Sequence, residues 1–396
     1  MQVLISSVGT RGDVQPAVAL ALELRKLGHE LRLCVPPNFI KWVGDLGFEA
    51  LPMGVEMRAP RPGTTPRTPP VLPDLIRDQF DTIEAAANGC NLIVGCGVHQ
   101  YAVRSIAELH GIPCVVAAYA PVSLPCLNLT PPGIAEQPRD DETNLRLWKE
   151  AKQSWNNRSL DRVNTNRARL NLGAVEDVLD HILADHPWLA ADRTLAPLPS
   201  TQSANVFQTG AWILPDSDAL PPELETFLNE GEPPVYLGFG SMPVVESINR
   251  TLIDAVRAVG MRVILSRGWA ELELIDEGQD CISIGDINQQ LLFPRVAAVV
   301  HHGGAGTTVA AGRAGAPQIT VPQFGDQFYW GRRIRNLGMG AAVPFSDLTV
   351  ESLILALRYV LEPSVLERAR SVSKSVDANG AAIAAQRLAE SMPFVA

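Results

Sequence analysis

The chain has 396 residues, of which 46% are hydrophobic and 19% charged; this allows two domains with separate cores and excludes a disordered or fibrous protein. Its formal net charge of −10 argues against nucleic acid or an anionic membrane surface as the main partner, because both attract basic stripes. Six cysteines lie far apart without a CxxC pair, which predicts buried thiols and neither a zinc site nor a disulfide framework.

Strand and helix signals alternate along the first half. "MQVLIS" predicts a strand, "QPAVALALELRKLGHE" a helix that begins near Pro16 and ends near Gly28, and "LRLCVPP" a second strand. The same alternation continues through "NLIVGCG", "QYAVRSIAELHG" and "IPCVVAAY", and such apolar strands indicate a parallel sheet covered on both faces. The start lacks the cationic region of a signal peptide, and no apolar run approaches ~20 residues, so we expect a cytoplasmic protein without a transmembrane segment.

Prolines mark the loops and the domain boundary. Residues 55–74 and 121–139 are proline-rich and predict long loops, where substrate specificity tends to lie. A proline-punctuated connection predicts a boundary near residue 215, and a second alternation of strands and helices begins at "PPVYLGFGSM". It predicts strands at 235–239, 262–265, 281–284, 296–300 and 317–321, with helices at 246–259 and 306–314. The fold class is therefore α/β, with two doubly wound domains in tandem.

The strongest local motif is "VVHHGGAGTTVAAGRAGAP", in which an apolar strand leads through a glycine-rich turn into a helix. Glycine lets a ligand approach the backbone, and the helix start offers free N–H groups to an anion. His302 and Thr307 add side-chain donors for phosphate oxygens, so the motif favours a phosphate site. The alternative is a tight turn in which glycine merely meets a positive φ.

Downstream, "VPQFGDQFYWGRRI" places Asp326 and Gln327 after another strand. A carboxylate beside an amide can accept and donate hydrogen bonds to the vicinal hydroxyls of a sugar. Taken alone, the pair could instead cap a helix or occupy a solvated turn. The pair follows the carboxyl end of a strand, where open α/β sheets bind ligands, and this favours a sugar-binding role.

These segments carry a family resemblance. The span from "PPVYLGFGSM" through "VILSRGWAEL" to "FGDQFYWGRRI" resembles the donor half of GT-B glycosyltransferases, specifically the bacterial enzymes that glycosylate glycopeptide antibiotics. "DHPWLAADRTLAPL" and "TGAWILPD" resemble the same group, while "GTRGDVQP" is shared with sterol glucosyltransferases. The resemblance implies Rossmann-like domains that face each other across a cleft. Residues 1–214 would bind the acceptor and 215–380 the donor, and a helix at 381–396 would return to the first domain.

The resemblance also implies an inverting hexosyltransferase of antibiotic biosynthesis, which moves a sugar from UDP or dTDP to an acceptor hydroxyl. It assigns the diphosphate to Ser241, His302, Gly304, Gly306 and Thr307, the nucleoside to Arg267, Gly268, Trp269, Ile287 and Asn288, and the sugar to Asp326 and Gln327. Ordinary alternatives are open: Ser241 could close a turn, Trp269 could be a packing residue, and Asn288 could cap a helix.

We expect no metal or other cofactor, because His302, hydroxyl groups and a helix N-terminus can stabilise the leaving diphosphate. A DxD sequence occurs at Asp216 and Asp218, but it lies in the proline-rich connection and not after an apolar strand. We interpret it as a solvated linker.

Inversion requires a base for the acceptor proton. In the resembled family this is an aspartate in the first loop of the acceptor domain, which matches Asp13, with Thr10 as a possible helper. The competing interpretation is an N-cap for the helix near Pro16, and a capping carboxylate would have a lowered pKa and be a weaker base.

Two further features concern the acceptor and the nucleobase. His99, expected where a strand ends at the cleft, is a candidate acceptor contact or an ordinary hydrogen-bonded histidine. Gln289 and Phe328 depart from the resembled family, which often has histidine and proline there, and bear on base preference and sugar fit. The proline-rich loops and the few charges around residues 122–132 favour a large, fairly apolar acceptor such as a polycyclic aromatic, a peptide, a sterol or a lipid. The resemblance implies an aromatic or peptide natural product with a hydroxyl group.

Three other functions fit the sequence less well. A nicotinamide dehydrogenase would need GxGxxG after the first strand, and neither "GTRGDVQP" nor "GCGVHQ" has that spacing. A sterol or lipid glucosyltransferase would use the same donor site with another acceptor. A catalytically silent sugar-nucleotide-binding protein is opposed by the joint presence of Asp13, His302, Asp326 and Gln327.

Overall fold

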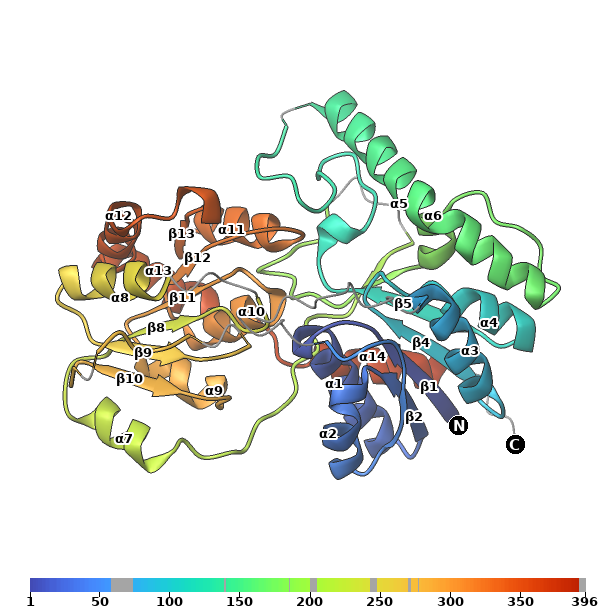
Figure 1. Cartoon of the computed structure of the whole chain (residues 1–396), viewed down its shortest axis with the longest axis horizontal. Coiled ribbons are helices and arrows are strands. Elements are labelled where there is room, and N and C mark those ends of the chain that lie inside the picture. Colours follow the sequence, from blue (N-terminus) through green and yellow to red (C-terminus); the bar gives the residue numbers. More distant parts are fainter. Residues whose placement is uncertain are drawn as a thin grey trace, which may run out of the picture.

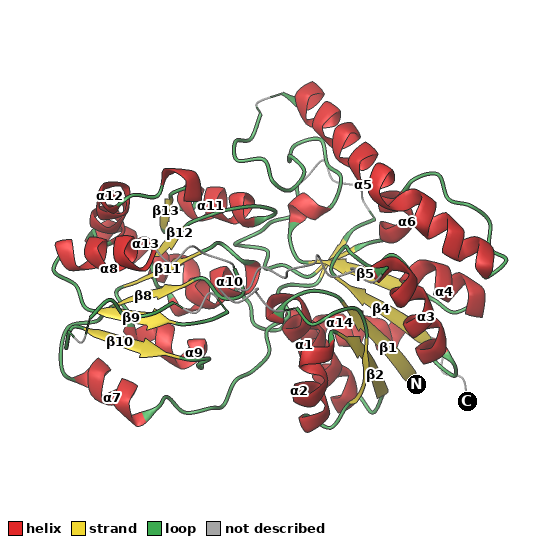
Figure 2. Cartoon of the chain, in the orientation of Figure 1, coloured by secondary structure: helices red, strands yellow, loops and turns green. Residues whose placement is uncertain are grey.

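Two parallel β-sheets form the centres of two lobes, and helices cover both faces of each sheet (Figure 1, Figure 2). The computed structural model describes residues 1–57, 74–138, 140–184, 186–199, 205–242, 248–269, 272–276 and 278–391. The expected α/β fold of two doubly wound, Rossmann-like domains is confirmed. The expected loop at 55–74 lies mostly outside the described residues.

The first lobe holds a seven-stranded sheet in the order β3-β2-β1-β4-β5-β6-β7. Its strands are β1 (Gln2–Ser7), β2 (Glu30–Val35), β3 (Glu49–Pro52), β4 (Leu92–Cys96), β5 (Cys114–Ala118), β6 (Trp188–Leu189) and β7 (Phe207–Gln208). Its helices are α1 (Arg11–Lys26), η1 (Pro37–Phe39), α2 (Ile40–Asp45), α3 (Leu75–Ala87), α4 (Val103–His110), η2 (Pro121–Ser123), α5 (Asp141–Arg169) and α6 (Val178–Leu183). Every residue of β4 is buried, which explains its unbroken apolar sequence.

The second lobe repeats this plan with six strands in the order β10-β9-β8-β11-β12-β13. The strands are β8 (Val235–Gly238), β9 (Val263–Ser266), β10 (Cys281–Ile284), β11 (Ala298–His301), β12 (Gln318–Thr320) and β13 (Gly340–Ala342). The helices of this lobe are α7 (Pro222–Asn229), α8 (Ile248–Ala258), α9 (Gln289–Leu292), η3 (Phe293–Arg295), α10 (Ala305–Ala314), α11 (Gln327–Asn336), η4 (Phe345–Asp347), α12 (Val350–Val360) and α13 (Pro363–Ser373). One further helix, α14 (Gly380–Ser391), follows them in the sequence.

Both sheets reverse their strand order at one point, between β1 and β4 in the first lobe and between β8 and β11 in the second. Crossovers leave in opposite directions there, so the carboxyl ends of the two central strands border an open crevice. The loops after these four strands contain Thr10, His99, Ser241 and His302. The topology therefore brings the predicted residues to the two crevices.

Helix α1 begins earlier than the sequence predicts. It starts at Arg11 and not near Pro16, because Thr10 is its N-cap and the Asp13 carboxylate accepts the Thr10 backbone N–H. Pro16 lies inside the helix, where it withholds a single backbone donor. Asp13 consequently occupies the first helical turn and does not precede the helix.

Helix α14 lies against α1 in the first lobe, although it follows the helices of the second lobe (Figure 1). Its Ala381, Ala384, Ala385 and Leu388 are buried in the same apolar core as residues of β1, β2 and α1. The chain thus crosses from the second lobe back to the first before it ends.

The described helices include none that is both long enough and apolar enough to cross a bilayer. The longest, α5, is rich in charged and amide side chains along its whole length. All six cysteines are free thiols, and four of them are buried, as the sequence predicts.

Candidate active site

The turn between β11 and α10 uses its two histidines differently. His301 is fully buried: its Nδ1 accepts the backbone N–H of Gly303 at 3.1 Å, and its Nε2 lies 3.0 Å from Gln318 Oε1. Burial lowers the pKa of His301 to about 3, so its ring is neutral and fixes the turn. Sequence reasoning assigned a ligand role to His302 and gave His301 no role of its own.

The ring of His302, unlike that of His301, lies over the glycine-rich turn at the start of α10. An added Cβ on Gly304 would collide with its imidazole, so glycine is required where the ring crosses the start of α10. Its Nδ1 is buried without a hydrogen-bond partner among the described residues, and burial lowers its pKa to about 4. A buried unpaired ring nitrogen beside free helix-terminal N–H groups suits a phosphate oxygen.

The loop after β8 completes this part of the site. Gly240 adopts φ +58°, and an added Cβ there would lie 3.4 Å from His302 Cε1. Ser241 follows directly, so the structure brings Ser241 to the same turn as His302, Gly304, Gly306 and Thr307. Gly306 is open, since an added Cβ would meet nothing within 4 Å. The backbone N–H groups of residues 305–307 have no helical partner because they lie in the first turn of α10.

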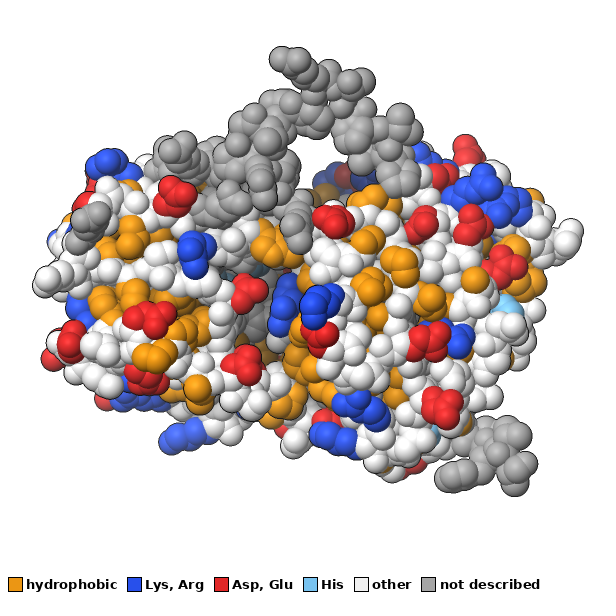
Figure 3. Space-filling model, turned by 60° about the horizontal axis from the view of Figure 1, so that its bottom comes forward, with side chains coloured by type: hydrophobic (Ala, Val, Ile, Leu, Met, Phe, Trp, Pro, Cys, Tyr) orange, Lys and Arg blue, Asp and Glu red, His pale blue; other side chains and the backbone are white. Residues whose placement is uncertain are grey.

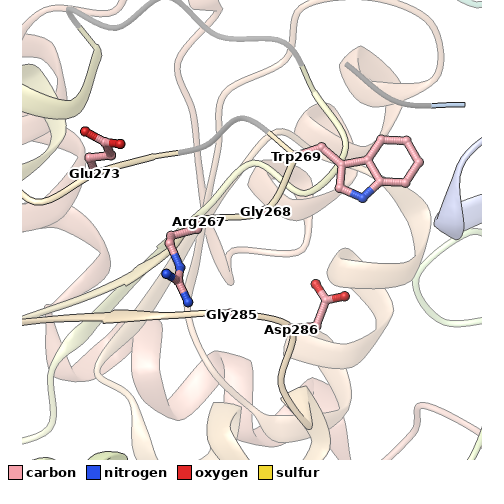
Figure 4. Close-up of a pocket in the computed structure, with 6 residues that line it drawn as sticks. All are labelled: Arg267, Gly268, Trp269, Glu273, Gly285 and Asp286. Carbon is pink, nitrogen blue, oxygen red and sulfur yellow. The ribbon is translucent and has the colours of Figure 1, made fainter. Parts of the chain in front are cut away.

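A pocket of 420 Å³ lies beside this turn, lined by Arg267, Gly268, Trp269, Glu273, Gly285 and Asp286 (Figure 4). Three of the predicted nucleoside residues therefore share one pocket. Sequence reasoning missed Glu273, Gly285 and Asp286; the last two directly follow β10, a position that could have indicated them. Ile287 is half-buried just beyond this pocket.

The side chain of Trp269 points away from Arg267, toward the first lobe (Figure 4). Its backbone N–H donates to Gly240 O at 2.8 Å, which ties it to the phosphate-side turn. Its ring stacks on Phe39 of the first lobe at 6.3 Å between centroids and 22° between planes. Trp269 thus belongs to the pocket and to the contact between lobes at once.

Asn288 is occupied by internal contacts. Its Oδ1 accepts the backbone N–H groups of Gln290 and Leu291, and its Nδ2 donates to the carbonyls of Asp216 and Asp218. Asn288 therefore caps helix α9, as the alternative to a nucleoside contact proposed, and its side chain is 2% exposed. Asp216 and Asp218 lie in an exposed connection, and no group of three or more metal-binding side chains occurs among the described residues.

Asp326 and Gln327 lie at the start of α11. Gln327 Oε1 accepts the backbone N–H groups of Gln323 and Phe324, so this amide shapes the turn that carries Asp326. Trp330 Nε1 donates to Asp326 Oδ2 at 3.0 Å, and burial raises the pKa of Asp326. The turn therefore presents one carboxylate, which Gln327 and Trp330 hold in place.

The two carboxylate oxygens of Asp13 have different surroundings. Oδ2 accepts the Thr10 backbone N–H at 2.8 Å and lies 3.3 Å from Thr10 Oγ1, while Oδ1 has no hydrogen bond to any described residue. Burial raises the pKa of Asp13 to about 6, the Thr10 N–H opposes this, and the charge of Asp326 adds to it. The expectation that capping lowers this pKa is wrong, because desolvation outweighs the capping hydrogen bond.

The two lobes bring their charged residues together at a hollow that is visible between them (Figure 3). Asp13 interacts electrostatically with Asp326, and Arg11 with Asp286 and Asp216. The acceptor-side and donor-side residues predicted from the sequence therefore face one another.

His99 lies in the loop after β4, exposed, with its ring stacked on Trp155 of α5 at 5.2 Å. Tyr101 stands edge-on to the same ring at 6.4 Å. The ring has aromatic neighbours and no hydrogen bond from the described residues, so the hydrogen-bonded alternative is not what the structure contains. Trp155 was not singled out in the sequence, because nothing local marks it as a neighbour of His99.

Solved structures with the same fold are glycosyltransferases. The glycotransferase of kitacinnamycin superposes with a TM-score of 0.75 at 18% identity and 99% coverage of both chains. Glycosyltransferase VinC in complex with DTDP gives a TM-score of 0.68 at 21% identity, covering 99% of this chain and 100% of its own. The two doubly wound lobes are therefore those of the GT-B fold.

Sequence relatives narrow the family. Residues 3–121 match the glycosyltransferase family 28 N-terminal domain, and residues 250–390 match the C-terminal domain of erythromycin biosynthesis protein CIII-like proteins. Glycosyltransferase GtfE of Amycolatopsis orientalis is 46% identical over 98% of this chain and 97% of its own. The vancomycin aglycone glucosyltransferase of that organism is 44% identical, covering 99% of this chain and 98% of its own.

A more distant relative is the sterol 3-beta-glucosyltransferase UGT80B1 of Arabidopsis thaliana, 29% identical over 95% of this chain and 66% of its own. The dTDP-epi-vancosaminyltransferase of Amycolatopsis orientalis is 42% identical over 94% of this chain and 93% of its own. The chain belongs to the family of the Amycolatopsis vancomycin-group glycosyltransferases, and it is a glycosyltransferase.

Proposed function

We propose that this glycosyltransferase moves a sugar, with inversion, from a dTDP- or UDP-sugar to a hydroxyl group of a peptide or polycyclic aromatic natural product. The observation that carries the proposal is the Asp13 carboxyl group, which has a raised pKa and an unbonded Oδ1 and faces the donor lobe. The names of two relatives, a vancomycin aglycone glucosyltransferase and a dTDP-epi-vancosaminyltransferase, support the donor and acceptor classes.

In this reaction the Asp13 carboxylate accepts the proton of the acceptor hydroxyl, and Thr10 holds the carboxylate in place. The acceptor oxygen attacks the anomeric carbon from the side opposite the diphosphate, whose C–O bond breaks with its electron pair moving to the phosphate oxygen. His302, Ser241, Thr307 and the N-terminus of α10 stabilise that developing charge without a metal.

The rest of the donor has a place in the same lobe. The pyrimidine nucleoside occupies the pocket beside Trp269, and Asp326 accepts hydrogen bonds from sugar hydroxyls through the oxygen that Trp330 leaves open. The acceptor approaches from the first lobe, where the stacked rings of His99 and Trp155 offer an aromatic surface.

The test is to incubate the protein with UDP-glucose and dTDP-sugars against glycopeptide aglycones, polycyclic aromatics, sterols and lipids, and to read sugar-sized mass additions. We expect transfer to a peptide or aromatic acceptor, with the same rate in EDTA. Transfer to sterols or lipids alone would overturn the acceptor class. Nucleotide binding without any transfer would indicate a silent binding protein.

A further inference from the structure

The loop before α5 extends from the first lobe to the second lobe, where it contacts the turn that carries Asp326. We call residues 129–135 the bridging segment. Its Gly133 N–H donates to Gly325 O at 2.8 Å, one residue before Asp326. In Figure 1 this loop of the first lobe approaches the start of α11. The wall of the proposed sugar site therefore contains backbone from both lobes.

Arg332 holds the other side of this contact. It lies on α11, and its Nη1 donates to Ile134 O at 2.6 Å and to Ala135 O at 2.9 Å, with Nη2 3.5 Å from Thr130 Oγ1. No other described residue donates to those two carbonyls. Hydrogen bonds from a charged guanidinium are stronger than neutral ones, and this side chain is half-buried.

Among the described residues, the first lobe bonds the backbone of the segment only at its beginning. Trp148 Nε1 donates to Leu129 O at 2.7 Å, and Gln137 Oε1 accepts the Thr130 N–H at 3.2 Å. Beyond these two residues, the backbone hydrogen bonds of the segment lead to Arg332 and Gly325 in the second lobe. The donor lobe therefore sets the position of the middle of the segment.

Helix α11 links these contacts to the sugar carboxylate. Trp330 donates to Asp326, and Arg332, two residues later, reaches the bridging segment. One rigid helix thus fixes both the carboxylate and the segment that borders it. A shift of the segment would widen the path by which the acceptor hydroxyl reaches the anomeric carbon.

We propose that Arg332 is a positioning residue that fixes the bridging segment as the acceptor-side wall of the sugar site, which raises acceptor affinity and keeps water from the donor. This rests on the proposed transferase function. Arg332 contacts neither substrate, and its influence passes through the carbonyls of Ile134 and Ala135.

The experiment compares Arg332→Ala and Arg332→Lys with Arg335→Ala, an exposed arginine on the same helix. For Arg332→Ala we expect the acceptor KM and the hydrolysed fraction of donor to rise roughly tenfold, as loss of charge-assisted hydrogen bonds implies. Affinity for dTDP, which lacks the sugar, should change less than about twofold. Arg332→Lys should restore part of the loss, and Arg335→Ala should match the wild type.

Hydrogen exchange at the Gly133 amide provides a readout that does not depend on activity. It should accelerate in Arg332→Ala and not in Arg335→Ala. An unchanged acceptor KM and Gly133 exchange rate would overturn the proposal, as would parallel losses of dTDP affinity and melting temperature in both Arg332 variants. If the wild type transfers no sugar, the proposed function fails, while exchange at Gly133 still decides whether Arg332 holds the segment.

Discussion

Asp13 combines a structural task with the proposed role of general base in one carboxyl group. Oδ2 closes the first turn of α1 by accepting the Thr10 N–H, and Oδ1 carries no hydrogen bond from the described residues. Burial, together with the charge of Asp326, raises its pKa to about 6 against the effect of the Thr10 bond. A base with a pKa in this range is mostly ionised at neutral pH and still basic enough to accept a proton.

Asp13→Asn separates these tasks, because an amide oxygen can accept the Thr10 N–H but cannot take a proton. We expect kcat to fall on the order of a hundredfold or more, with dTDP affinity unchanged. The melting temperature at pH 8 should be unchanged or higher, since the raised pKa means that the folded protein disfavours the charged carboxylate there. Near-normal turnover in this variant would rule out Asp13 as the base.

The pH profile tests the electrostatic coupling between the lobes. Because the deprotonated carboxylate is the active form, kcat/KM should decrease as the pH falls below about 6, the pKa of Asp13. Asp326→Asn removes a negative charge that raises this pKa, so the acidic limb should move to lower pH even though the overall rate also drops. Asp347→Asn, at an exposed site on η4, serves as control and should leave the limb in place. An acidic limb that stays at the same pH in Asp326→Asn would contradict an electrostatic interaction between Asp13 and Asp326.

At the scale of elements, the turn between β1 and α1 is shaped around the carboxylate of Asp13, the proposed base. Gly9 adopts φ +131°, a conformation that side chains rarely take, and an added Cβ would collide with the Asp13 carboxylate. Ser7 Oγ and Tyr119 Oη each donate to the Asp13 backbone carbonyl at 3.0 Å. The end of β1, the turn and the residue that follows β5 together fix the first turn of α1.

Gly9→Ala should therefore displace the carboxylate as well as strain the backbone. We expect at least a tenfold loss of kcat and a loss of stability of about 1–3 kcal/mol. Gly89→Ala is the matched control: Gly89 has φ +79°, but an added Cβ would meet nothing within 4 Å. It should lose comparable stability in urea unfolding and keep its kcat. Equal kcat losses in the two variants would argue against the collision with Asp13.

The elements also show which features a sequence can reveal. The strand predicted at 281–284 is β10 (Cys281–Ile284), and Asp13, His302 and Asp326 all follow predicted strands, because parallel strands direct their carboxyl ends to one edge. The start of α1, the stacking of Trp269 on Phe39 and the reach of Arg332 were not predicted. The last two depend on a side chain meeting a partner that is distant in the sequence, whereas the start of α1 rests on the local capping pair of Thr10 and Asp13.

At the scale of the whole molecule, the proposed nucleoside pocket is not confined to the second lobe. Trp269 lines the pocket and stacks on Phe39, while Phe39 stands edge-on to Trp42 at 6.2 Å and Arg11 lies 4.0 Å above the Trp42 ring. A nucleotide that contacts Trp269 therefore also touches a structure shared by both lobes. Its binding should stabilise the molecule as a unit.

Thermal unfolding with UDP, dTDP and NAD in parallel tests the nucleotide class. At about 100 times its Kd, a bound nucleotide adds about 2.7 kcal/mol, which corresponds to an increase of a few degrees in melting temperature. We expect this increase with a pyrimidine diphosphate and not with NAD, since the chain lacks the dinucleotide fingerprint after β1. Stabilisation by NAD alone would contradict a nucleotide-sugar site.

The return of α14 to the first lobe makes the stability of that lobe depend on the end of the chain. Leu388 is 1% exposed and lies in the core with residues of α1, so Leu388→Ala should cost roughly 2–5 kcal/mol. Gln386→Ala, at an exposed position on the same helix, is the control. Hydrogen exchange should accelerate in α1 but not in α12, because α14 packs against α1, whereas the buried residues of α12 lie in a separate core. Equal acceleration in both helices would mean that the two lobes unfold together, and α14 would then stabilise the whole molecule and not one lobe.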